Sequence, residues 1–190
     1  MSTRHLLGLL AFVIVAVPAQ AADLIAHPQI ALETTEGRIV LELDTKRAPL
    51  TVERIVELTR KGYYDGLIFH RVKRGFVIQT GAYNLKLQSS EKNENLPNES
   101  GNGLSNRRGT VAMARTPAPH SAGAQFYINV ADNEGLDPRR DNWGYALFGK
   151  VIEGMDVVDT ISNLPTGPQA GLQDVPTLPV VIDKATVLTD

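Results

Sequence analysis

The chain has 190 residues, of which 43% are hydrophobic and 21% are charged, a composition that suits one globular domain with a substantial core. The formal net charge of −2 gives no attraction to nucleic acid, whose phosphate backbone repels a mildly acidic protein. Cysteine is absent, which excludes disulfide frameworks, thiol nucleophiles and cysteine-ligated zinc. The 16 glycines and 11 prolines predict many turns, and therefore short strands more than a helical bundle.

Residues 1–21 have the three-part order of a secretory signal peptide. A basic start with Arg4 precedes an apolar run over 6–17, and the small residues around Ala21 are typical of a peptidase site. The apolar run is too short for a membrane anchor, because a hydrocarbon core is about 30 Å thick. We expect cleavage after Ala21 and a mature single domain of residues 22–190 that does not associate with a membrane. Export of a chain without cysteine favours a bacterial periplasm.

The mature sequence predicts many short strands and two helices. Apolar and polar residues alternate over 30–43 on either side of a tight turn, which predicts a β-hairpin. Pro49 and Gly62 flank an amphipathic pattern that predicts a helix over 50–61, and Gly154 precedes a second short helix. Such a pattern is typical of a closed or nearly closed antiparallel barrel with helices at its open ends. Further strands are expected near 67–72, 76–79, 110–114, 125–130, 145–149 and 179–188, with a long polar loop over 84–108.

The segment FHRVKRGFVIQTG, residues 69–81, holds the most informative polar residues. Strand periodicity places Arg71 among apolar neighbours, where an arginine requires either a carboxylate or a substrate as its partner. Gln79 follows at an even spacing and would share the face of Arg71 if the turn at Gly75 preserves the register. The residues alone leave two interpretations open: a binding site on this face, or an exposed arginine with a solvated glutamine at a rim.

Residues 69–81 resemble the signature of the cyclophilin family of peptidyl-prolyl isomerases. The resemblance continues through GTVAMARTPAPHSAGAQFYINVADNEGLD (109–137) and GYALFGKVIEGMDVVD (144–159), and it extends from about residue 29 to the end of the chain. The signal-like start and the long loop make the sequence most similar to the periplasmic bacterial branch. The resemblance implies a mainly β fold, a closed eight-stranded antiparallel β-barrel capped by two α-helices. It also implies an active groove on the outer face of the barrel, which accepts X–Pro peptides.

The resemblance further implies a role for each residue at a matching position. Arg71 would be the catalytic guanidinium, beside an apolar pocket that receives the proline ring. Gln79 would hydrogen-bond a substrate carbonyl, and the backbone of Ala114 and Arg115 would pair with the extended substrate chain. No cofactor or metal is implied. The residues expected to bind substrate are His70, Phe76, Val77, Gln79, Met113, Ala114, Arg115, Gln125, Tyr127, Leu136 and Tyr145.

These residue types suit rotation about a prolyl amide, which needs no bond breaking, nucleophile or metal. The amide resists rotation by about 18–20 kcal/mol because its nitrogen shares a lone pair with the carbonyl. A guanidinium beside that nitrogen can donate a hydrogen bond that strengthens only as conjugation is lost. Apolar side chains can hold the pyrrolidine ring while the acyl side rotates. The same apolar residues at strand spacing are also typical of barrel core, an interpretation that the residues alone leave open.

Several positions depart from the family pattern. Val77 stands where methionine is common and Tyr127 where phenylalanine is usual, and both changes are tolerable in an apolar pocket. Gly135 occupies the position of the tryptophan that cyclosporin-sensitive members use, and Tyr145 occupies that of a histidine. The wall that binds this drug is therefore reduced, and we expect weak cyclosporin binding.

Three other functions were weighed against the isomerase. His120 and Ser121 do not predict a serine hydrolase, because adjacent loop residues cannot aim at each other and no nucleophile elbow surrounds the serine. His27, His70 and His120 show no metal-ligand spacing. The third function is a holdase that binds proline-containing unfolded or partly folded polypeptides without turnover, and Arg71 favours the enzyme over it. Client proteins and the preference for the residue before proline stay open, and a monomer is the default.

Overall fold

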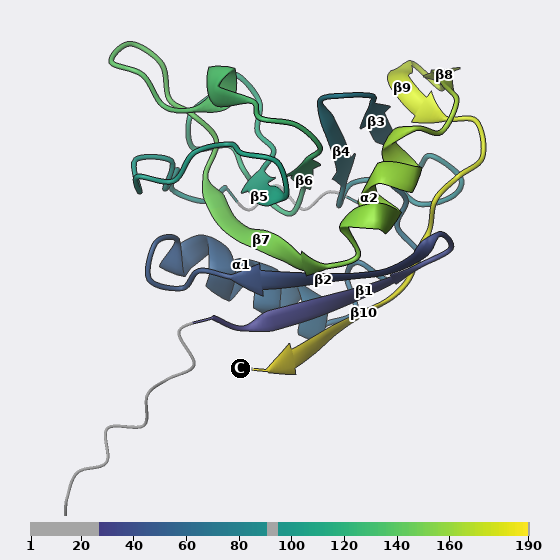
Figure 1. Cartoon of the computed structure of the whole chain (residues 1–190), viewed down its shortest axis with the longest axis horizontal. Coiled ribbons are helices and arrows are strands. Elements are labelled where there is room, and N and C mark those ends of the chain that lie inside the picture. The colour runs from purple at the N-terminus through teal and green to yellow at the C-terminus, as the bar shows by residue number, and fades with distance from the viewer. Residues whose placement is uncertain (1–26, 91–94, 190) are drawn as a thin grey trace, which may run out of the picture.

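The computed structural model describes residues 27–90 and 95–189 of the chain, which form ten strands, two α-helices and one short 3-10 helix (Figure 1). The signal peptide expected over 1–21 lies outside these ranges. No helix within them is long and apolar enough to cross a membrane. The elements are β1 (Gln29–Thr34), β2 (Gly37–Leu43), α1 (Pro49–Arg60), β3 (Arg71–Lys73), β4 (Val77–Thr80), β5 (Thr110–Met113), β6 (Phe126–Asn129), η1 (Glu134–Leu136), β7 (Leu147–Glu153), α2 (Met155–Ser162), β8 (Thr166–Gln169), β9 (Leu172–Pro176) and β10 (Ile182–Thr189).

Eight of the strands form one antiparallel sheet in the order β10-β1-β2-β7-β5-β6-β4-β3, which confirms the mainly β class, the strand number and the two helices. The expected closure of the barrel needs correction, because the ladder has two edges, β10 and β3, and the sheet is a half-barrel. The edges meet only through a bridge between Ile68 and Val181 and neighbouring bonds such as that from the Phe69 N–H to the Val180 carbonyl, 3.0 Å. These residues precede β3 and β10, and β3 has only three residues, so no continuous ladder can form.

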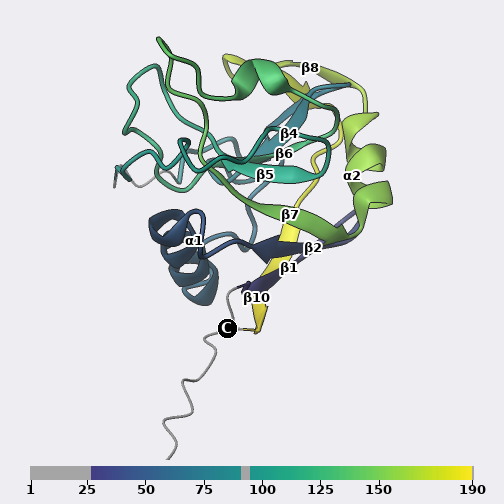
Figure 2. The ribbon, with the colours of Figure 1, turned by 60° about the vertical axis from the view of Figure 1, so that its left-hand side comes forward.

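The concave side of the sheet encloses the main core. Phe69, Phe126 and Phe148 are at most 1% exposed, and the rings of Phe126 and Phe148 meet edge to face with centroids 6.2 Å apart. Burial of each such side chain stabilises the fold by about 1.5–3 kcal/mol. The helices α1 and α2 lie at opposite ends of the sheet, at the left and right of Figure 2, and both contribute buried residues to the main core. Val158 and Ile161 of α2 are fully buried, as their spacing along the helix predicts.

The first predicted helix forms within one residue of its expected bounds, and the second begins directly after Gly154, as expected. Pro49 is the first residue of α1, where its missing N–H is not needed. The side chain of Glu99, from the long polar loop, accepts hydrogen bonds from the backbone N–H groups of Leu50 and Thr51 at 3.1 and 2.9 Å. A carboxylate there satisfies two free donors and complements the helix dipole. The loop between β4 and β5 therefore caps α1.

The sequence did not predict the hairpin of β8 and β9. Gly167 and Pro168 in β8 read as turn residues, and neither strand shows a buried alternating face. Its connection, Ala170 and Gly171, has positive φ angles of 48° and 84°, which suits a two-residue hairpin turn. The hairpin packs β9 against β3, and this contact brings a carboxylate to the face of Arg71, as described below.

Candidate active site

Strand alternation places two apolar clusters on opposite faces of the same strands. In β4 and β6, Ile78 and Ile128 point into the main core, whereas Val77 and Tyr127 belong to a second cluster on the outer face. The outer cluster is small and borders an open pocket. Its buried members are Val77, Ala112, Tyr127 and Leu147, and its partly buried members are Phe76, Leu104, Ala114, Leu136 and Tyr145.

One pocket on this face gathers most of the residues expected to bind substrate. It lies over β4 and β6 and is closed on one side by η1. The apolar members meet the polar ends of an arginine and a glutamine here, which excludes barrel core as the whole explanation of these side chains. The pocket is lined by Arg71, Phe76, Val77, Gln79, Ala114, Arg115, Tyr127, Leu136 and Tyr145.

Met113 does not line the pocket, which corrects its expected role. Its side chain is 1% exposed and packs within the main core. The neighbouring residue Ala112 belongs to the buried part of the outer cluster instead, because a step of one residue along a strand turns the side chain to the opposite face.

The guanidinium of Arg71 lies at the edge of this pocket and is oriented by three partners. Its Nη1 donates to Oε1 of Gln79 at 3.3 Å, and its Cζ lies 5.9 Å from the ring centroid of Phe76. Its Nε lies 3.9 Å from Oδ2 of Asp174 in β9. The sequence predicted that this arginine needs a carboxylate or a substrate; the structure places a carboxylate and an open pocket beside it.

Asp174 is a residue of the site that the sequence analysis missed. It has a φ of 57°, a left-handed conformation that aspartate tolerates better than most residues. No local pattern could have identified it, because it lies in the hairpin that was not predicted and is far from Arg71 along the chain. The only available signal was the unpaired arginine itself.

Gln79 joins the pocket to a second cavity, which is lined by four of the predicted residues, two of them, His70 and Gln125, absent from the first pocket. The Gln79 Nε2 donates to Oε1 of Gln125 at 3.0 Å, so the two amides form a continuous polar edge. His70 lies in this second cavity, with its ring 4.9 Å from that of Tyr83. The cavity is lined by His70, Arg71, Gln79, Tyr83, Gln125, Leu172 and Gln173.

His70 is uncharged at neutral pH. The residue is only 5% exposed. Burial is the main cause that lowers its pKa to about 4, and the positive charge of Arg71 is the second. A second positive charge is therefore absent next to the guanidinium. His70 supports the groove from beneath as a neutral ring.

The far wall of the pocket consists of two tyrosines and an arginine. The rings of Tyr127 and Tyr145 meet edge to face with centroids 5.7 Å apart, and the Arg115 guanidinium lies 4.7 Å from the Tyr145 ring centroid. The Nε of Arg115 donates to the Gly144 carbonyl at 3.0 Å. The side chain of Arg115 thereby fixes Tyr145, in addition to the backbone role that was expected of it.

Comparison with known proteins identifies this arrangement. A sequence model of the family described as cyclophilin type peptidyl-prolyl cis-trans isomerase matches residues 29–187. The chain belongs to this family. The match confirms the resemblance seen in the sequence, and it includes every residue of the pocket and every strand of the sheet except the last two residues of β10.

Bacterial cyclophilins are among its relatives. Over 162 residues the chain is 51% identical to peptidyl-prolyl cis-trans isomerase cyp18 of Streptomyces antibioticus, an alignment that covers 84% of this chain and 98% of the relative. It is 44% identical to peptidyl-prolyl cis-trans isomerase A of Dickeya dadantii, with 90% and 89% covered, and 45% identical to peptidyl-prolyl cis-trans isomerase B of Escherichia coli, with 83% and 98% covered. These relatives support peptidyl-prolyl cis-trans isomerase activity.

Solved structures support the cyclophilin fold. A crystal structure of a cyclophilin type isomerase of Cryptosporidium parvum superposes with a TM-score of 0.71 at 24% identity, covering 86% of this chain and 99% of that one. A second structure of the same protein, determined in the presence of the dipeptide Ala-Pro, gives a TM-score of 0.70. At this identity the likeness concerns the fold alone.

The histidine and serine of the hydrolase alternative do not face each other in this cyclophilin. The Ser121 hydroxyl donates to the Ala118 carbonyl at 2.7 Å, while Nδ1 of His120 accepts from the Asn98 N–H at 3.0 Å. Within residues 27–90 and 95–189, no group of three or more His, Cys, Asp or Glu side chains could hold a metal ion.

Proposed function

We propose that the protein accelerates rotation about X–Pro bonds in unfolded or partly folded exported polypeptides, with Arg71 acting on the twisted prolyl amide. The observation that carries this proposal is the pocket itself. The guanidinium of Arg71 stands at the edge of an apolar cavity walled by Phe76, Tyr127 and Leu136. A ring held in that cavity would bring its amide nitrogen to the charged edge.

Arg71 would supply the catalytic hydrogen bond. Among the described residues, its guanidinium makes one hydrogen bond, to Gln79, so that further N–H donors point toward the pocket and its solvent. As the prolyl amide twists, nitrogen regains a localised lone pair that accepts such a donor better than the planar amide does. Because the donor is already oriented by Gln79 and Asp174, little reorganisation is needed when the bond rotates.

Gln79 and the segment after β5 would hold the substrate backbone. The Ala114 N–H already donates to the Gln125 carbonyl at 2.9 Å, so the Ala114 carbonyl and the Arg115 N–H would be the groups that pair with an extended peptide. The amide of Gln79 would hydrogen-bond the carbonyl on the acyl side. The proline ring and the chain would then be held while the bond between them rotates.

A prolyl-isomerisation assay on Ala-Pro and Phe-Pro peptides tests this proposal. We expect Arg71→Ala to lower kcat/KM by about 10²-fold or more, the usual effect of removing a donor to developing charge. Arg74→Ala is the matched control, because Arg74 is exposed on the turn that follows β3. Circular dichroism would show that both variants fold. Wild-type protein that binds the peptides without accelerating them would support the holdase instead, and an active Arg71→Ala variant would exclude the catalytic role.

The setting of the reaction also belongs to this proposal. Cleavage after Ala21 would release a mature domain of residues 22–190 into the periplasm, where it would act as a monomer on exported chains. Mass measurement of the protein from a periplasmic fraction would give the cleavage site. Weak cyclosporin binding is expected because Gly135, beside Leu136, presents no side chain to the drug. A nanomolar dissociation constant would contradict that expectation.

A further inference from the structure

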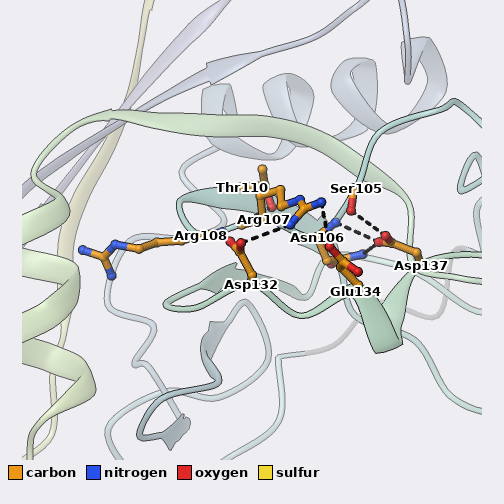
Figure 3. Close-up of polar contacts among 8 residues, drawn as sticks. All are labelled: Ser105, Asn106, Arg107, Arg108, Thr110, Asp132, Glu134 and Asp137. Carbon is orange, nitrogen blue, oxygen red and sulfur yellow. Dashed lines mark hydrogen bonds and ion pairs between the residues drawn. The ribbon is translucent and has the colours of Figure 1, made fainter.

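The short helix η1, which carries Leu136 to the pocket, is fastened to one buried residue on both sides. Before the helix, the N–H of Asn133 donates to the Asn106 carbonyl at 2.7 Å. After it, the Asp137 carboxylate accepts from the backbone N–H and from Nδ2 of Asn106, both at 2.8 Å (Figure 3). Asn106 is 0% exposed, so loss of a partner would leave a buried polar group unsatisfied. No residue of η1 is fully buried, and polar contacts therefore determine where it lies.

Asn106 also contacts the opposite wall of the pocket. The hydroxyl of Tyr127 donates to Oδ1 of Asn106 at 2.8 Å, and Nδ2 of Asn129 donates to the same oxygen at 3.1 Å. Burial raises the pKa of Tyr127 far above its usual value, so its hydroxyl remains a donor. The two donors to Oδ1 fix the orientation of the Asn106 amide, with Nδ2 directed at Asp137. One unbroken chain thus joins the Tyr127 wall to the Leu136 wall.

Asp137 is an acceptor on both of its oxygens. The Ser105 hydroxyl donates to Oδ2 at 2.5 Å, opposite the two Asn106 bonds to Oδ1. Burial is the largest single influence on its pKa and acts to raise it, but the hydrogen bonds from Ser105 and Asn106 together lower the pKa. An ionised carboxylate is therefore the stable form. An amide of the same size carries no charge, so the two Asn106 bonds to its oxygen would be weaker, and its NH2 group could not accept from Ser105.

We propose that Asn106 and Asp137 are positioning residues that fix the distance between Tyr127 and Leu136, and that this clamp makes the pocket selective for the five-membered proline ring. The inference rests on the proposed function, which places the ring between these two side chains. A pocket with fixed walls rejects a ring with one more methylene by roughly 10- to 200-fold, whereas a wall that can move admits both rings. The hydroxyl of Tyr127 links this wall of the pocket to Asn106, and a phenylalanine at this position would lack that hydrogen bond.

The test compares Asp137→Asn with Asp159→Asn, the same chemical change on the other side of the same loop. Asp159 accepts from Nη1 and Nη2 of Arg108, both at 2.8 Å. Figure 3 shows the Arg108 side chain directed away from Asn106. Asp159 lies in α2 and does not line the pocket. Both variants lose a carboxylate that is hydrogen-bonded to residues 105–108, but only Asp137→Asn would weaken the attachment of η1.

Kinetics are measured on an Ala-Pro peptide and on the same peptide with the six-membered pipecolyl ring in place of proline. We expect Asp137→Asn to raise KM for the proline peptide about fivefold while kcat changes less than about twofold, because the pocket binds the ring equally in the ground and transition states. The preference for proline over pipecolyl in kcat/KM should fall about fivefold. Asp159→Asn should leave both quantities within about twofold of wild type. A structural defect alone would lower the active fraction and leave the ring preference unchanged.

Tyr127→Phe gives a second route if Asp137→Asn does not fold, since it removes only the hydroxyl. It should lower the ring preference about two- to threefold, and combined with Asp137→Asn it should add nothing further, because both changes break one chain. Three outcomes would overturn the clamp. These are an unchanged ring preference in either single variant, changes of equal size in Asp159→Asn, and additive effects in the double variant. An inactive wild type would overturn the proposed function and the clamp with it, whereas an active wild type with an unaltered Asp137→Asn would overturn the clamp alone.

Discussion

The two halves of the groove are held by different kinds of interaction. One half lies on β4 and β6, where the backbone ladder pairs Gln79 with Tyr127 and fixes the face on which each side chain stands. The other half consists of η1 and the β8–β9 hairpin, which present Leu136 and Asp174. Side-chain hydrogen bonds and one ion pair hold these elements. Truncation of a core side chain beneath the strand half therefore acts through packing and stability, whereas a substitution of a polar contact in the loop half acts on the geometry of the site.

Met113→Ala tests the packing beneath the strand half, since β5 pairs with β6, and should give the largest change in stability. The side chain is buried in the main core, so we expect truncation to lower the free energy of unfolding by about 2–5 kcal/mol. Because Met113 does not line the pocket, kcat/KM per folded molecule should stay unchanged. Urea unfolding and the peptide assay, performed on the same preparation, measure the two quantities. A raised KM in fully folded protein would instead show that Met113 contributes to the substrate pocket.

His70→Gln is expected to change how stability depends on pH. Burial and the Arg71 charge lower the pKa of His70 to about 4, whereas an unfolded histidine titrates near 6.5. Between these values the unfolded chain binds more protons, so wild-type stability falls as the pH is lowered from about 6.5 to 4, by up to about 3 kcal/mol. The variant lacks this group and should lose less stability over the same range.

Urea unfolding at several pH values between 4 and 7 measures this difference. His120→Gln is the control, because His120 is exposed and lines neither groove cavity. It should follow the wild-type curve. Parallel pH dependence in wild type and His70→Gln would show that His70 does not lose its proton on folding.

The same division explains what the sequence could predict. Arg71, Val77, Gln79 and Tyr127 lie on one face because alternation along paired strands is a local rule, and the family resemblance placed them correctly in one pocket. Alternation also holds in β5, but Val111, Ala112 and Met113 are all apolar and buried, so the sequence shows no contrast between the two faces. Where all residues of a strand segment are apolar, the sequence does not indicate which side chains face the groove and which face the core.

The loop half could not be predicted because its contacts join residues distant in sequence. Asp174 reaches Arg71 from a hairpin whose glycines and prolines read as loop, and Asn106 and Asp137 are 31 residues apart in the sequence. The open edge between β3 and β10 has the same origin, since the bridge between Ile68 and Val181 depends on where two distant segments end. Strand periodicity carries no information about such pairs.

Asp174→Asn tests the loop half at its other end and should give the smallest effect. Asparagine tolerates the left-handed φ of 57°, so the hairpin should keep its backbone while the charge beside Arg71 is lost. The ion pair is partly exposed, at 34% and 38% for the two side chains, and such pairs contribute about 0.2–1 kcal/mol. We expect kcat to fall about two- to fivefold with little change in KM, because the guanidinium is less well oriented for the twisted amide.

The control for this prediction is Asp183→Asn, which changes an exposed carboxylate of β10 and should behave as wild type. Added salt should narrow the gap between Asp174→Asn and wild type, since it screens the interaction that the variant lacks. A change confined to KM would instead assign Asp174 to substrate binding rather than to the orientation of Arg71.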